Sequence, residues 1–154
     1  MTFEYSDRLC VDGTMYRIDA RPLAEAFKLY DLPAFAPIWP VSSRGYFGYW
    51  AVFDNHLVLE HIWPAEACKP AELFPHITGP VVAHWFSGLV RGRGGERRYT
   101  GASAREFFND EVFLEVTDGV VARRWSLDLR SVPDQTDAEF KRLCPEFLWP
   151  ERLR

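Results

Sequence analysis

The chain has 154 residues, a length typical of one domain, and we expect a single domain over residues 1–154. Hydrophobic residues make up 47% of it and aromatic residues 16%, which excludes an intrinsically disordered chain. The net charge of −4 argues against general binding of nucleic acid or of an anionic membrane. It suits either a cytosolic enzyme or an inhibitor of a basic partner.

The cysteines and the apolar runs indicate the compartment. Cys10, Cys68 and Cys144 are odd in number, far apart and without metal-ligand spacing, so we expect free thiols in a reducing compartment. The N-terminal residues do not read as a signal peptide, and no apolar run is long enough to span a membrane. The sequence therefore predicts a cytoplasmic protein with no membrane association.

Two short strands and a helix are predicted in the first 30 residues. The strands lie within residues 2–19 around an Asp12-Gly13 turn, and the second covers residues 14–18. A helix follows over residues 21–30, because Pro22 suits a first turn and apolar residues recur at spacings of three and four. Residues 31–43 are rich in proline and are predicted to form an ordered loop.

Residues 44–63 are the most informative stretch and predict a β-hairpin closed by Asp54-Asn55. Both turn residues tolerate positive φ, and this turn places Gly48 opposite His61 and Tyr46 opposite Trp63. Both faces are apolar, so we expect the hairpin in the middle of a sheet that is covered on both sides. One face is predicted to carry Tyr46, Trp50, Val52, Leu57, Leu59 and Trp63, and the other Phe47, Tyr49, Phe53, Val58 and Ile62.

The following 45 residues give weaker signals. A short helix is predicted within residues 65–73 and a strand over residues 81–90. The glycine-rich residues 91–95 are interpreted as a turn that returns the chain through residues 96–100. Ser103 is a candidate cap for one helical turn over residues 103–108.

The C-terminal region predicts a second clear hairpin and a helix. The hairpin joins residues 111–117 to 120–129 through Asp118-Gly119, and the helix covers residues 136–143 with Thr136 as its cap. This register puts Glu115 diagonal to Arg124 and stacks one apolar face, comprising Val112, Leu114, Val116, Val121 and Trp125. The whole pattern predicts an α+β fold: one curved antiparallel sheet built of hairpins, with a helix near each end.

No combination of residues in the sequence dictates a chemistry. His56 and His61 point to opposite faces of one predicted strand, and no histidine or cysteine spacing suits a metal. We therefore assign no catalytic residue, no metal ligand and no cofactor, and a non-enzymatic role is favoured. His61, opposite Gly48, is interpreted as a core histidine with satisfied hydrogen bonds, and a catalytic role is the alternative.

Two elements resemble binding sites. Arg44 lies at the entrance of the aromatic hairpin and could hold a carboxylate or phosphate between Tyr46 and Trp63, or could instead stack on an aromatic ring and close the core. The arginines within residues 91–98 could bind phosphate, or form a solvated loop. The candidate residues for a partner or ligand are Arg44, Tyr46, His61, Trp63, His84 and Trp85.

A longer set of motifs carries a resemblance. The motifs are Arg44-Gly45-Tyr46, Trp50 with Val52, Leu57 with Leu59, Leu73-Phe74-Pro75 and VAHWFSG at residues 82–88. Together they resemble a widespread group of small uncharacterised bacterial proteins with the pattern RGY, WEI, LYL, LF and A-x-WF-[ST]-G. The resemblance covers about residues 16–122 and implies a fold but no activity, and this chain has Ala51 and His84 where the group usually has acidic residues.

Three functions follow as hypotheses. The first is a cytosolic protein that binds a protein partner, such as an immunity protein that neutralises a cognate bacterial toxin, because tryptophan and tyrosine are abundant and no catalytic set is present. The alternative is an enzyme or small-molecule-binding protein with a pocket around Arg44, Tyr46, His61 and His84. The second alternative is RNA binding through a loop from Arg91 to Arg98.

Overall fold

The computed structural model describes residues 6–32, 35–37, 44–64, 68–99, 106–131, 137–149, 151 and 154. Its strands are β1 (Asp7–Val11), β2 (Thr14–Ile18), β3 (Phe47–Phe53), β4 (His56–Trp63), β5 (Val81–Val82), β6 (Gly88–Tyr99), β7 (Glu106–Thr117) and β8 (Val120–Asp128). Its helices are α1 (Pro22–Tyr30), α2 (Pro70–Leu73) and α3 (Asp137–Leu143), and a 3-10 turn covers Glu146–Leu148. The described chain is thus mostly a sheet with a few short helices.

The strands form one sheet that closes on itself. Their order is β3-β1-β2-β6-β7-β8-β4-β5, and β3 also pairs with β4, so that β5 alone lies outside the ring. The pairs in the described ranges are antiparallel, except that β1 runs parallel to β3. The seam between β4 and β8 is narrow: the Leu57 N–H donates to the Gly119 carbonyl at 2.9 Å. The predicted antiparallel sheet is confirmed, and its curvature is that of a barrel.

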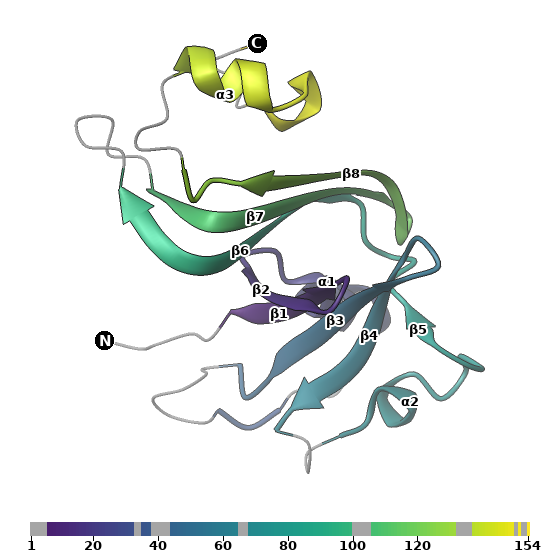
Figure 1. The fold of residues 1–154 in the computed structure, drawn as a ribbon. Coiled ribbons are helices and arrows are strands. Elements are labelled where there is room, and N and C mark those ends of the chain that lie inside the picture. Colours follow the sequence, from purple (N-terminus) through teal and green to yellow (C-terminus); the bar gives the residue numbers. More distant parts are fainter. Residues whose placement is uncertain are drawn as a thin grey trace.

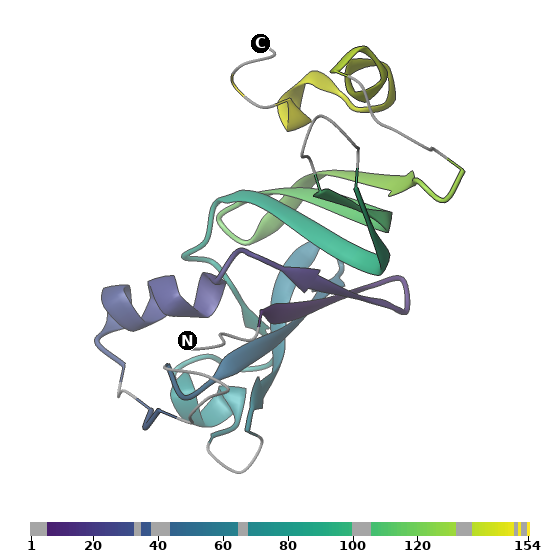
Figure 2. The same cartoon turned by 90° about the vertical axis from the view of Figure 1, so that its left-hand side faces the viewer.

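Two walls of this barrel face each other across the core. Figure 1 shows β6, β7 and β8 as one layer above the layer that contains β1 to β4, and Figure 2 shows both layers from the side. In both views α2 and α3 lie at opposite ends of the molecule. The fully buried side chains of the core cluster include Leu9, Ile18, Leu23, Trp50, Leu57, Phe74, Val90, Val112 and Leu114.

A smaller apolar cluster lies on the opposite face of β7. Phe113 packs there with Cys144 and Leu148, which follow α3 in the chain. The indole N–H of Trp125 donates to the Leu143 carbonyl at 3.1 Å, and that of Trp149 donates to the Cys144 carbonyl at 2.9 Å. The Trp125 hydrogen bond and the packing on Phe113 hold the C-terminal segment on the outside of the barrel wall, while the Trp149 hydrogen bond lies within the segment.

The three predicted hairpin turns are confirmed. Asp12, Asp54 and Asp118 have φ values of 49°, 49° and 48°, and the next residue in each turn also has positive φ. Such pairs of left-handed residues match the right-handed twist of the flanking strands. The predicted helices over 21–30 and 136–143 correspond to α1 and α3, while residues 65–67 and Thr136 lie outside the described residues.

The predicted register of the central hairpin is correct near its turn and wrong beyond Leu59. Trp50 faces Leu59 as expected, but Tyr49 faces His61 and Phe47 faces Trp63, so β4 contains one extra residue, Glu60. A bulge of this kind moves every later side chain to the other face. Ile62 therefore joins the core instead of Trp63, and the expected pairing of His61 with Gly48 does not occur.

A second irregularity corrects the C-terminal hairpin. Glu115 faces Arg123 directly and Val116 faces Val121, so β8 carries an extra residue at Ala122. Trp125 lies opposite Phe113, on the outer face, rather than with Val112 and the core. The expected diagonal of Glu115 with Arg124 is wrong for the same reason.

The predicted strand over 81–90 is confirmed only at its two ends, and the predicted turn over 91–95 is wrong. β5 ends at Val82, and β6 begins at Gly88 and continues through the glycine-rich segment to Tyr99, with a bulge between Gly94 and Arg97. Phe107 and Phe108, expected in a helical turn, belong to β7, and Ser103 lies outside the described residues. The arginines of residues 91–98 are thus on a strand and not in a loop.

Crowding inside the barrel explains these glycines. A Cβ atom on Gly92 would lie 2.6 Å from Val112 Cγ1 and 2.9 Å from Tyr16 Cβ, and one on Gly94 would lie 3.0 Å from Tyr16 Cδ1. Side chains alternate along a strand, so the intervening Arg91 and Arg93 point to the outer face. The Arg-Gly alternation therefore reflects a strand with no room on its inner side.

We expect Gly92→Ala to lower the free energy of unfolding by about 1–3 kcal/mol, because the added methyl group overpacks the core against β7 and Tyr16. Urea denaturation measures this loss. Ser126→Ala, at an exposed position of β8, is the control and should stay within about 0.5 kcal/mol of the wild type. Equal stability of the Gly92→Ala variant and the wild type would contradict the crowding argument.

Candidate functional site

The residues singled out in the sequence fall into separate places, and the first of them, Arg44, lies beside a buried carboxylate, Asp7. Asp7 begins β1 with its side chain fully buried. Its Oδ1 accepts a hydrogen bond from the Gly48 backbone N–H and its Oδ2 accepts one from Trp50 Nε1, both at 3.1 Å. Arg44 Nη2 lies 3.9 Å from the Asp7 carboxylate. Asp7 thus links β1 to β3 through directed hydrogen bonds.

Burial raises the pKa of the Asp7 carboxyl, and the two N–H donors and the Arg44 charge offset part of that rise. Arg44 also lies over the Tyr46 ring, 5.0 Å from its centroid, and Tyr46 stacks on Phe27 of α1 at 4.9 Å. Of the two roles considered for Arg44, these contacts match the structural one, in which the arginine stacks on an aromatic ring. Trp63 is not a second wall of this site, since it stacks on Phe47 on the other face.

Trp85 and His84 lie elsewhere. Trp85 Nε1 donates to the Pro22 carbonyl at 2.7 Å, and its ring stacks on buried Phe74 at 5.1 Å. These contacts tie residues 83–87 to the start of α1. His84 is exposed, and its backbone N–H donates to the Val82 carbonyl.

A concave surface with titratable side chains runs along β4, and we call it the β4 groove. It has a volume of about 470 Å³, within the range of ligand sites, and α2 and residues 79–81 form its other wall. A second hollow of about 400 Å³ shares Leu59, Glu60, His61 and Pro80 with it and extends to Phe53. The groove is lined by Leu59, Glu60, His61, Ile62, Cys68, Lys69, Pro70, Ala71, Gly79, Pro80 and Val81.

The bulge at Glu60 creates the polar part of this groove. Consecutive strand residues normally point to opposite faces, yet Glu60 and His61 both line the same groove. Both side chains are exposed, so the interpretation of His61 as a core histidine is wrong. Of the four residues of the expected pocket, Arg44, Tyr46, His61 and His84, only His61 lines this groove.

The groove offers binding groups rather than an activated nucleophile. Burial and the neighbouring Glu72 raise the pKa of the Cys68 thiol, so it is protonated at neutral pH. Its Sγ donates to the Lys69 carbonyl at 3.2 Å. Within the described ranges, no group of three or more histidine, cysteine, aspartate or glutamate side chains is placed to hold a metal ion.

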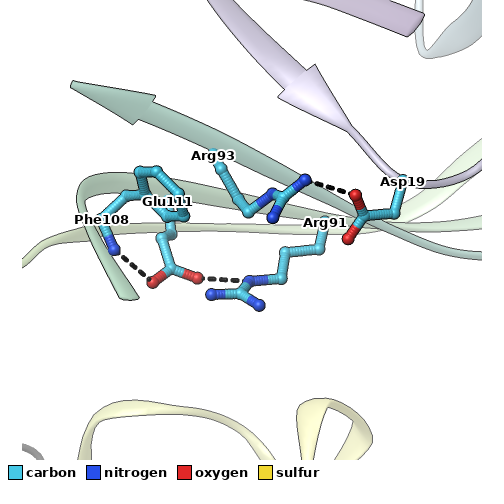
Figure 3. A network of polar contacts seen from close by, with 5 residues as sticks. All are labelled: Asp19, Arg91, Arg93, Phe108 and Glu111. Atoms are coloured by element: carbon cyan, nitrogen blue, oxygen red, sulfur yellow. Dashed lines mark hydrogen bonds and ion pairs between the residues drawn. The ribbon is translucent and has the colours of Figure 1, made fainter. Parts of the chain in front are cut away.

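Two arginines of β6, Arg91 and Arg93, are paired with carboxylates, as Figure 3 shows. Arg91 Nε donates to Glu111 Oε1 at 2.6 Å, while Glu111 Oε2 accepts the Phe108 backbone N–H at 3.2 Å. Arg93 pairs with Asp19 and lies over the Phe108 ring, 5.4 Å from its centroid. Because Glu111 is only 4% exposed, its pair with Arg91 belongs to the structure of the wall.

Comparison of the chain with protein-family models, with curated proteins and with solved structures yields no match. None of the helices in the described ranges has the length and apolar character needed to cross a membrane.

Sequence reasoning missed Glu60, Phe53 and Asp7 as site residues. Phe53 is 66% exposed at the tip of the central hairpin, although the apolar pattern predicted that this face is covered. The burial of Asp7 had a local signal, since it precedes Leu9 and Val11 in an alternating pattern, but its partners lie about 40 residues away.

We expect the free energy of unfolding of the wild type to rise relative to that of Asp7→Asn as the pH falls from 7 to 4.5. The folded pKa of Asp7 is raised, so the stability it contributes is fully present below the unfolded value of 3.8 and is lost as the pH rises through the folded pKa. Asparagine does not titrate, and each unit of pKa elevation corresponds to about 1.4 kcal/mol. Urea denaturation at both pH values measures the difference, and a constant difference would contradict the raised pKa.

We expect Arg91→Ala to destabilise the protein by about 1–3 kcal/mol, because it leaves the buried Glu111 carboxylate without its guanidinium. Thermal and urea denaturation measure the loss. The control is Arg130→Ala, which removes ion pairs from Asp110 and Asp128 at an exposed position and should cost about 0–1 kcal/mol. Equal losses in the two variants would show that the Arg91 pair has no special structural role.

Proposed function

We propose that this chain is a cytosolic partner-binding protein, of the kind that neutralises a toxin by direct contact, and that it binds through the β4 groove and the adjoining Phe53. The observation that carries the proposal is a large apolar side chain, 66% exposed, at the end of a groove whose walls are mostly apolar. Aromatic side chains beside a pocket are typical of the residues that dominate binding energy in protein interfaces.

The distribution of charge supports a basic partner. On and beside β6, β7 and β8, carboxylates pair with arginines, as in Asp19 with Arg93 and Glu115 with Arg123. Glu60 in the groove and Asp54 beside Phe53 are exposed and form no ion pair among the described residues. Uncompensated carboxylates near an apolar groove attract a positively charged protein and raise its association rate.

The RNA-binding alternative is less well supported. It needs arginines that are available to phosphate groups on a loop, whereas Arg91 and Arg93 lie on β6 and engage Glu111 and Asp19. Phosphate binding would have to break a largely buried ion pair at Glu111.

We expect the purified chain to form a one-to-one complex with a basic protein encoded beside it, and to suppress the toxicity of that protein when both are expressed. Phe53→Ser should weaken the complex at least tenfold, equivalent to about 1.4 kcal/mol, in isothermal titration calorimetry. The melting temperature should stay within about 2 °C of the wild type, because the side chain is exposed.

Leu29→Ser is the matched control, since Leu29 of α1 is 64% exposed and does not line the groove. It should leave the affinity unchanged. If no complex forms, or if the two serine variants weaken it equally, the proposed binding surface is wrong.

A further inference from the structure

β4 has an open edge alongside the groove. β5 pairs with β4 only at Val58 and Leu59, and β8 pairs with it only at His56, whereas the strand continues to Trp63. On the side away from β3, residues 60–63 have no partner strand in the part of the chain that the structure describes. Figure 1 shows β4 continuing past the short β5 toward α2. An open strand edge presents backbone N–H and C=O groups that can pair with another chain.

The groove provides space for such a chain. Its walls are Leu59 to Ile62 of β4 on one side and the start of α2 with residues 79–81 on the other. An added strand in this position continues the direction in which β5 already pairs with β4. Alternate side chains of the added strand then meet apolar contacts at Leu59, Ile62, Pro70 and Val81.

The two charged groups of the groove occupy different walls. Glu60 is the bulged residue of β4 and lines both hollows, while Lys69 lies at the start of α2 and lines only the larger one. A strand paired with β4 therefore lies next to the Glu60 carboxylate, on the opposite side of the groove from Lys69. A basic side chain of the added strand opposite Glu60 forms an ion pair across the two strands.

We propose that the occupant of the β4 groove is an extended segment of a partner protein that adds as a strand to residues 60–63 and places a lysine or arginine against Glu60. This inference rests on the proposed function and specifies how the partner is recognised. Backbone hydrogen bonds with β4 supply the affinity for the segment, and the Glu60 carboxylate supplies the preference for a basic side chain.

The test uses capped peptides and the full chain, with backbone amide resonances observed by NMR. The peptide acetyl-VKVKVKV-amide should shift the resonances of residues 60–63, and acetyl-VEVEVEV-amide should bind at least fivefold more weakly. N-methylation of alternate amides of the lysine peptide should abolish binding, because it removes the backbone donors that pair with β4.

Variants separate the charge at Glu60 from the general charge of the chain. Glu60→Gln should lower the affinity for the lysine peptide at least fivefold. Lys69→Gln, on the opposite wall, should leave that affinity unchanged or increase it. If the N-methylated peptide binds as well as its parent, or if the shifts fall outside residues 60–63, strand addition is wrong.

The two sets of measurements distinguish failure of strand addition from failure of the proposed function. If the protein complex forms and depends on Phe53, while Glu60→Gln leaves its affinity unchanged and the lysine peptide does not bind, partner binding stands and strand addition is overturned. If the lysine peptide binds as expected while no basic neighbour forms a complex, strand addition stands and the assigned partner is wrong.

Discussion

The pairing of β3 with two strands at once is the constraint on which the fold depends. β3 runs parallel to β1 and antiparallel to β4, so it joins the N-terminal hairpin to the central one and closes the ring. Asp7 lies at this seam with its two oxygens bonded to β3, across separations of 41 and 43 residues. Burying a carboxylate costs free energy unless its oxygens accept hydrogen bonds. Asp7 therefore favours the one alignment of β1 against β3 that provides these bonds over alignments shifted by a residue or more.

The parts of the fold that the sequence predicted are those decided by local chemistry. Asp12-Gly13, Asp54-Asn55 and Asp118-Gly119 adopt the left-handed conformations that their residue types favour, and each determines the pairing next to it. The extra residues at Glu60 and Ala122 depend on how strands bend around a closed barrel, which no local pattern encodes. Each reverses the faces beyond it, and the wrong positions of Trp63 and Trp125 follow directly.

The same distinction holds for the candidate site. Arg44 and Tyr46 were identified from their chemistry, yet the partner that explains them, Asp7, lies far away in the sequence. His61 does lie at a groove, but because of the bulge and not because it faces Gly48. The groove itself exists only where α2 and residues 79–81 meet β4, and that meeting is a property of the tertiary structure.

Closing the ring has a consequence for the behaviour of the chain at high concentration. Closing the sheet shortens the exposed strand edges through which β proteins aggregate, and within the described chain residues 60–63 of β4, the short β5 and most of β8 have no partner strand on one side. Two copies of the protein that paired through the β4 edge would each bring a Glu60 carboxylate to it, and repulsion between the like charges disfavours that pairing. The carboxylate that we assign to a basic partner strand thus also disfavours self-association of the free protein.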